Sequence, residues 1–143
     1  MGTLDRLKGG RLVDGLSHRI LVVEDFAPFR QFVSSMLAKR PEFQIVGEIA
    51  DGLEAVKKAE KLRPDLILLD IGLPTLNGIA AARQIRVLVP ESKIIFLSLE
   101  SSADVIEEAF GLGWGYVLKS KAASDFLIAI ETVLSGKRFI SSA

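Results

Sequence analysis

The 143-residue sequence contains no cysteine and only one histidine, His18. The absence of cysteine excludes disulfides, thiol nucleophiles and thiolate-bound metals, and it suits a reducing cytoplasm. Eighteen basic residues balance eighteen acidic residues, so the composition indicates no polybasic surface for nucleic acid or for an anionic membrane. The apolar runs span only a few residues each, far fewer than the ~20 that a membrane-spanning helix requires.

The N-terminal stretch differs in composition from the rest of the chain. Residues 1–18 are rich in Gly, Lys, Arg and Asp and show weak apolar periodicity. They include basic residues but no following apolar core, so the stretch is not typical of a signal peptide. We predict a disordered extension over residues 1–18, one domain over residues 19–136, and a short segment over residues 137–143. A chain of this length suits a single domain with its own core.

Short apolar runs alternate five times with amphipathic stretches after Arg19. Several runs are almost purely apolar, which is typical of strands that helices cover on both faces. The intervening stretches repeat apolar residues at the helical period, and helices are predicted at about 52–62, 77–88 and 122–134. The sequence therefore predicts an α/β fold, a flavodoxin-like doubly wound five-stranded parallel sheet of order 2-1-3-4-5 with five helices. The five runs are residues 20–24, 43–50, 66–70, 94–98 and 115–118.

Polar side chains follow the predicted strands where the strands end. In a sheet of this order, ligands bind beyond the carboxyl ends of the strands, at the point between strands one and three where the order reverses. Strand one ends in Glu24 and Asp25, and strand three ends in Asp70. Strand four ends in Ser98, and strand five is followed by Lys119. We therefore expect three carboxylates, one hydroxyl and one ammonium group to meet at one edge of the sheet.

Three neighbouring carboxylates predict a bound cation. Two carboxylates about 4 Å apart repel by about 4 kcal/mol at an effective dielectric constant of ~20. A divalent cation removes this repulsion, and the all-oxygen ligand set indicates Mg²⁺, with Mn²⁺ as a substitute. Because Mg²⁺ usually keeps sites for water and phosphate oxygens, the cluster predicts phosphate chemistry. Asp70 is then the candidate nucleophile, with Lys119 and Ser98 placed to contact the phosphoryl oxygens.

These residues, in this order, resemble the receiver domain of two-component response regulators. The matching pieces lie at residues 22–25 and 70–78, at Ser98, and at residues 115–119, and the likeness covers residues 19–136. The resemblance implies that Asp70 is the phosphoacceptor. It also implies that Glu24, Asp25, Asp70 and the backbone carbonyl of Gly72 hold the metal ion, with Asp25 as a direct ligand. Ser98 and Lys119 would bind the phosphoryl group, and Tyr116 would act as an aromatic switch.

The resemblance also implies partners. The phosphodonor would be a sensor histidine kinase or a phosphotransfer protein, and a cytoplasmic homodimer would form on phosphorylation through helices one and five or four and five. Residues 134–141 look like the segment that leaves the receiver in regulators with a C-terminal helix-turn-helix DNA-binding domain. We therefore expect a linker to begin at residue 137, and DNA contact only through a domain outside this chain. A stand-alone receiver is the alternative.

Three positions depart from the usual pattern of the family. Leu99 stands where a small residue is common, and its bulk would narrow access to the phosphoryl group or hinder Ser98. Gly72 offers no side chain over the site and Glu100 offers an acid, so both are expected to tune hydrolysis of the acyl phosphate. Leu99 supports the alternative of a degenerate receiver, a phosphorylation-independent protein-interaction domain. Gly72 argues against an aspartyl phosphatase, which usually carries a second acid there, and we expect no dedicated enzyme.

Overall fold

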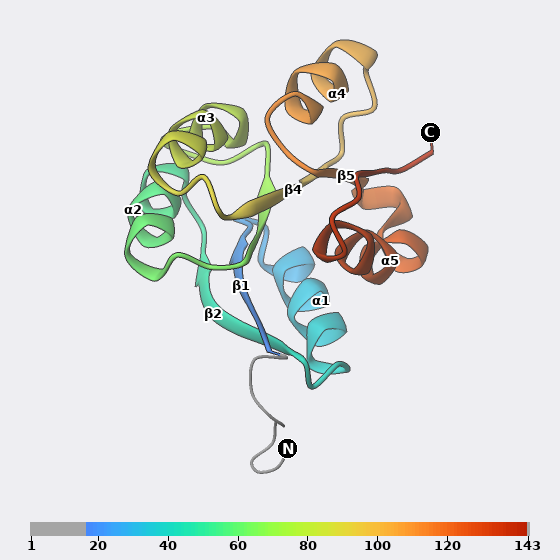
Figure 1. The fold of residues 1–143 in the computed structure, drawn as a ribbon. Coiled ribbons are helices and arrows are strands. Elements are labelled where there is room, and N and C mark those ends of the chain that lie inside the picture. Colours follow the sequence, from blue (N-terminus) through green and yellow to red (C-terminus); the bar gives the residue numbers. More distant parts are fainter. Residues whose placement is uncertain (1–16, 143) are drawn as a thin grey trace.

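Strands and helices alternate along residues 17–142, which are the residues described by the computed structural model (Figure 1). The predicted extension over residues 1–18 lies almost wholly outside this range, although β1 already begins at His18. In chain order the elements are β1 His18–Val23, α1 Ala27–Ala38, β2 Phe43–Ile49, α2 Gly52–Leu62, β3 Leu66–Asp70, α3 Gly78–Leu88, β4 Lys93–Ser98, α4 Ala103–Phe110, β5 Gly115–Leu118, the 3-10 turn η1 Lys119–Lys121, α5 Ala122–Leu134 and β6 Phe139–Ile140.

The strands form one parallel sheet of order β2-β1-β3-β4-β5-β6. The predicted order 2-1-3-4-5 and the five helices are confirmed, but the expected number of five strands is too low. The additional strand, β6, pairs with the outer edge of β5 through residues that were predicted to begin a linker. Two residues are too short a run to show strand periodicity, so the sequence pattern alone did not predict β6.

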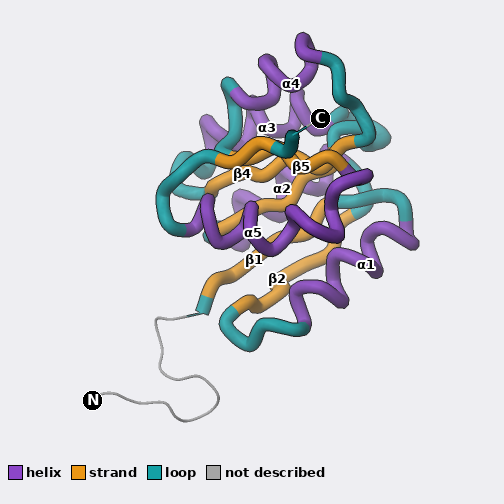
Figure 2. Tube along the Cα trace, turned by 90° about the vertical axis from the view of Figure 1, so that its right-hand side faces the viewer, coloured by secondary structure: helices purple, strands orange, loops and turns teal. Residues whose placement is uncertain are grey.

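Helices cover both faces of the sheet (Figure 2). Side chains alternate between the two faces along each strand because a strand has a side-chain period of two. In β1, for example, Leu21 and Val23 pack toward α2, α3 and α4, whereas Ile20 and Val22 pack toward α1 and α5. All four are fully buried, as the apolar runs predicted. Within residues 17–142, no helix is long and apolar enough to cross a membrane.

Side-chain caps fix the starts of three helices. Asp51 accepts a hydrogen bond from the Glu54 N–H at 2.8 Å at the start of α2, and Asn77 accepts one from the Ala80 N–H at 2.9 Å at the start of α3. Ser102 caps α4 in the same way, by accepting a hydrogen bond from the Val105 N–H. Each cap satisfies a backbone donor that the helix leaves unpaired. The caps of α2 and α3 lie at the carboxyl end of the sheet, so they also set the entry of the chain into the loops around Asp70.

A close backbone contact positions the end of β3. A Cβ atom at Gly78 would lie 2.1 Å from the Asp70 carbonyl oxygen and 2.7 Å from the Ile71 Cα, so only glycine fits at the start of α3. This contact lets α3 begin directly against the strand end that carries Asp70.

We expect Gly78→Ala to lower the free energy of unfolding by about 2–3 kcal/mol, because the added methyl group must displace backbone atoms. Gly111→Ala is the matched control, because its Cβ would meet no atom closer than 3.5 Å. Urea unfolding of both variants measures the difference. Equal stabilities of the two variants would contradict the close packing of α3 on the end of β3.

Candidate functional site

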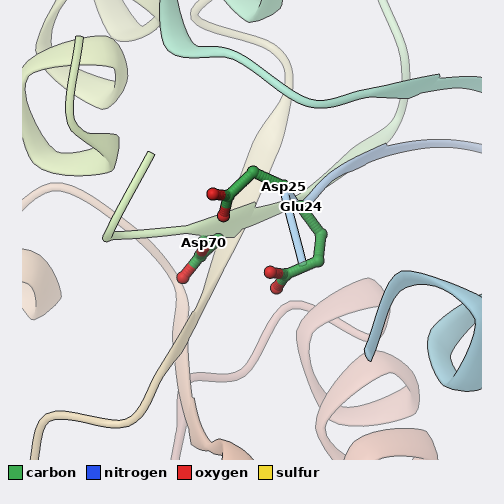
Figure 3. Close-up of side chains that lie close together, drawn as sticks. All are labelled: Glu24, Asp25 and Asp70. Atoms are coloured by element: carbon green, nitrogen blue, oxygen red, sulfur yellow. The ribbon is translucent and has the colours of Figure 1, made fainter. Parts of the chain in front are cut away.

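Five polar side chains meet where four strands end. Glu24 and Asp25 follow β1, Asp70 ends β3, Ser98 ends β4, and Lys119 follows β5. The sheet places β1, β3, β4 and β5 side by side and parallel, so their carboxyl ends share one edge. Figure 3 shows the three carboxylates gathered around one space, from the ends of two adjacent strands. The structure thus brings together every polar side chain that the strand-end argument selected.

The three carboxylates are close enough to share one ion. Glu24, Asp25 and Asp70 each offer an oxygen, and these oxygens all lie within 4.8 Å of one another. The Glu24 side chain is fully buried and Asp70 is nearly so, whereas Asp25 is exposed. A cation entering from solvent would therefore meet Asp25 first.

Lys119 provides the positive charge at the centre of the site. Its Nζ lies 2.9 Å from Glu24 Oε1, and it donates a hydrogen bond to Glu24 Oε2 at 3.1 Å. The same Nζ lies 3.4 Å from Asp70 Oδ1. Glu24 is thus turned toward Lys119, and its Oε2 also accepts the Phe26 N–H at 3.1 Å. Charge-assisted contacts of this kind offset part of the cost of burying a carboxylate.

The residues present fit a divalent cation. Their donor atoms are all oxygens, which suits a hard cation such as Mg²⁺. Glu24 Oε1 is buried without a hydrogen bond, since its 2.9 Å approach to Lys119 Nζ lacks hydrogen-bonding geometry. A buried carboxylate oxygen that has an ion pair but no hydrogen bond, beside two further carboxylates, can still accept a bond to a cation. The acidic cluster therefore has the composition and spacing of a metal site.

The environment of Asp70 disfavours its charged form. Burial, and then the nearby Glu24 carboxylate, raise the pKa of Asp70 from 3.8 to about 6, although Lys119 and the Gly72 N–H oppose the shift. The Gly72 N–H donates to Asp70 Oδ1 at 3.3 Å. Asp70 thus carries a charge that the protein compensates only in part. Binding of a cation would relieve that cost.

Ser98 and Tyr116 are both linked to Glu100, although they do not lie on the same strand. The Ser98 hydroxyl accepts a hydrogen bond from the Glu100 N–H at 2.9 Å. The Tyr116 hydroxyl donates to the Glu100 carbonyl oxygen at 2.6 Å, and the Tyr116 ring is fully buried. Burial raises the pKa of the Tyr116 phenol, which keeps it protonated as a donor. The backbone of Glu100 therefore connects the two residues.

The site opens into a cavity of about 570 Å³ with a partly apolar lining. Leu99 lies at this cavity and is 83% exposed, so its side chain does not close the entrance. Gly72 and Glu100 also line the cavity and are exposed. The contribution of Leu99, Gly72 and Glu100 to hydrolysis remains a prediction, as does metal binding by the Gly72 carbonyl.

Two phenylalanines of the site were not selected from the sequence as functional residues. Phe29, in α1, packs against the apolar core, but its ring also lies 4.8 Å from Lys119 Nζ and lines the cavity. Phe26 is 60% exposed at the cavity and its N–H holds Glu24. Their positions one and four residues after Asp25 are the signal that would have found them, because α1 begins at the edge of the site.

The chain belongs to the response regulator receiver domain family, whose model matches residues 20–131. Residues 20–131 contain all the polar residues of the site. The predicted family and fold class are therefore confirmed.

Relatives and solved structures agree with this assignment. The chain is 34% identical over 123 residues to the transcriptional regulatory protein DegU of Brevibacillus brevis, covering 85% of this chain and 52% of DegU. It is 46% identical over 81 residues to a protein-glutamate methylesterase/protein-glutamine glutaminase of Alkalilimnicola ehrlichii, covering 57% of this chain and 21% of that protein. A two-component response regulator of the LuxR family from Aurantimonas sp. SI85-9A1 superposes with a TM-score of 0.83 at 31% identity, covering 87% of this chain and 90% of that one. The chain thus spans about half the length of DegU and about a fifth of the methylesterase.

Replacing Asp70 with Asn should stabilise the metal-free protein. A carboxyl group whose pKa is raised on folding contributes stability that is complete below pH 3.8 and is lost as the pH rises through about 6. At pH 7.5 we therefore expect Asp70→Asn to raise the free energy of unfolding by about 1–3 kcal/mol. We also expect the wild-type protein, but not this variant, to gain stability as the pH falls from 7 to 5.

Urea unfolding in the presence of a chelator measures both effects. Asp104→Asn, at an exposed position in α4, is the control for the removal of one negative charge. A variant at position 70 that is no more stable than this control would show that Asp70 carries no electrostatic cost in the folded protein.

Proposed function

We propose that this domain is a phosphoacceptor switch of two-component signal transduction, with Asp70 as the residue that receives the phosphoryl group. The observation that carries the proposal is the meeting of Asp70 with Glu24, Asp25 and Lys119 at one edge of the sheet. Membership of the receiver family supports it. The donor would be a sensor histidine kinase or a phosphotransfer protein.

The proposed step is a displacement at phosphorus. A carboxylate oxygen of Asp70 attacks the donor phosphoryl group, an O–P bond forms, and the bond between phosphorus and the donor imidazole breaks. The imidazole leaves with the electron pair of that bond. Lys119 then turns from an ion pair with Asp70 to a partner of the phosphoryl oxygens, while Glu24 keeps the ammonium in place. Attack by water on the acyl phosphate would later regenerate the carboxylate.

Magnesium is the proposed cofactor. Asp25, Glu24 and Asp70 would hold it, together with the carbonyl of Gly72, and Mn²⁺ would substitute. When bound, the ion supplies positive charge that offsets the carboxylates and the incoming phosphoryl group. Two of the three carboxylates are largely buried, and their fixed positions support the proposal that the protein supplies ligands to the ion.

A hydroxyl that turns toward the new phosphoryl group would start the relay. Ser98 now accepts the Glu100 N–H, and a turn of its side chain would free that backbone group. The Glu100 carbonyl is the partner of Tyr116, so the loop between β4 and α4 links the two residues. We propose that Ser98 and Tyr116 pass the change to the surface of α4, β5 and α5. A homodimer would form through that surface, or the surface would pass the conformational change to a C-terminal helix-turn-helix domain that binds DNA.

The proposed role is switching in the cytoplasm rather than dedicated catalysis. The relative that is a methylesterase matches over 21% of its own length, so the likeness does not extend to most of that protein. We propose a receiver over residues 19–136, an extension over residues 1–18 that ends where β1 begins, and the start of a linker over residues 137–143, of which residues 139 and 140 pair with β5 as β6. The degenerate receiver is the alternative, and the experiment below separates the two.

Incubation with Mg²⁺ and acetyl phosphate should add one phosphoryl group to the wild-type protein and none to Asp70→Asn. Intact mass spectrometry follows the adduct, and Asp104→Asn serves as the control for loss of one acidic side chain. Folded wild-type protein that shows no adduct would favour the degenerate receiver, while steady turnover of an added phosphoester would favour an enzyme.

Magnesium should raise the midpoint of thermal unfolding, and Asp25→Ala should abolish that gain. A ligand that binds only the folded state stabilises by about 2.7 kcal/mol when its concentration is 100 times its Kd. Because Asp25 is exposed, its replacement should leave the stability of the metal-free protein almost unchanged. An equal gain from magnesium in the wild type and the variant would rule out Asp25 as a ligand.

A further inference from the structure

The residues that follow α5 cross three elements within four positions. Figure 1 shows this segment, in dark red, passing beside β5 between α4 and α5. At its start, Arg138 donates hydrogen bonds to the carbonyl oxygens of Phe110 and Gly113, and its guanidinium carbon lies 3.7 Å from the centroid of the Phe110 ring. Arg138 therefore satisfies carbonyl groups that the C-terminal end of α4 leaves free.

In its middle the segment pairs with β5. The Phe139 N–H donates to the Trp114 carbonyl oxygen at 3.0 Å, and the Ser141 N–H donates to the Tyr116 carbonyl oxygen at 2.9 Å. These bonds make β6 the outer strand of the sheet. The outer edge of β5, which would otherwise expose unpaired backbone groups, is covered by the chain itself.

At its end the segment is anchored by a buried hydroxyl. Ser141 is 7% exposed, and its hydroxyl donates to Asp125 Oδ2 at 2.8 Å in the first turn of α5. The same hydroxyl accepts the Leu118 N–H at 3.2 Å. Leu118 directly precedes Lys119, so one hydrogen bond separates the segment from the strand end that positions the central ammonium group. The Ser141 hydroxyl is buried and uses both its donor and an acceptor site. Pulling it away from β5 and α5 therefore costs more free energy than moving a surface serine would.

We propose that residues 138–141 form a clasp that the chain lays across α4, β5 and α5, and that the clasp and the phosphoryl group at Asp70 oppose each other. The clasp spans only four residues, so it holds the end of α4 at a fixed distance from the start of α5. The proposed contacts of the phosphoryl group would draw Ser98 and Lys119 inward. Ser98 ends β4, from which a loop leads into α4, and Lys119 begins the turn η1 that leads into α5, so the inward movement would strain the clasp.

Two consequences follow from this arrangement. Phosphorylation loosens the contacts of residues 138–141 with α4, β5 and α5. Loss of the clasp in turn makes the site easier to fill, because a coupling free energy acts equally in both directions. The opposition rests on the proposed function, whereas the clasp itself does not.

Amide hydrogen exchange, followed by NMR on the full 143-residue chain, tests the clasp without any phosphoryl group. Ser141→Ala and Arg138→Ala remove its two ends, and the exposed neighbours Ser142→Ala and Lys137→Ala are the matched controls. Loss of one hydrogen bond is expected to raise the exchange rates of the Leu118 and Ser141 amides about threefold to tenfold. Because Arg138 is exposed, its variant keeps the test valid if Ser141→Ala fails to fold. Rates equal to those of the controls would overturn the clasp.

Beryllofluoride with Mg²⁺, a mimic of the phosphoryl group, tests the opposition. In the wild-type protein its binding should speed exchange at the Phe139 and Ser141 amides. Both clasp variants should bind it about threefold to tenfold more tightly than the controls, in proportion to the exchange effect. Unchanged or weaker binding by the variants would overturn the opposition. If the wild type binds none at all, the proposed function fails and the opposition with it, while the exchange rates still decide the clasp.

Discussion

The ammonium group of Lys119 holds the site together. It lies within ion-pair distance of two largely buried carboxylates, Glu24 and Asp70, that come from neighbouring strands. Burial removes hydration from these carboxylates, and without a nearby cation they would also repel each other. The order of the sheet makes this compensation available, because the end of β5 reaches across β4 to the ends of β1 and β3. The Phe29 ring beside Nζ adds a favourable face for the same charge.

The strand β5 has two roles that its position explains. One end delivers Lys119 to the carboxylates, and the Tyr116 side chain reaches the loop after β4. Its outer edge pairs with residues 139–141. Groups that respond to the site and groups that hold the C-terminal segment are therefore attached to the same four-residue strand. A displacement of that strand cannot change one set of contacts and leave the other as it was.

Much of the fold and most of the polar site could be predicted from the sequence, for a simple reason. Strand runs that are apolar on both faces, and the rule that ligands bind at strand ends, depend on local pattern and topology alone. The direction of Glu24 toward Lys119 and the second role of Phe29 depend on side chains that meet only in the folded chain. The strand β6 was missed because its two residues gain their order from the β5 edge and the Ser141 anchor. The sequence of residues 137–143 alone does not indicate that this segment pairs with β5.

The single tryptophan has a position of practical value. Trp114 lies immediately before β5, with Lys93 Nζ 4.3 Å from its ring centroid, and its carbonyl oxygen accepts the first hydrogen bond of β6. Its ring packs in the same apolar cluster as Phe139. Intrinsic fluorescence excited at the indole therefore comes from one chromophore, which sits beside the segment after α5. The molecule contains its own optical reporter, with no need for a dye or an added label.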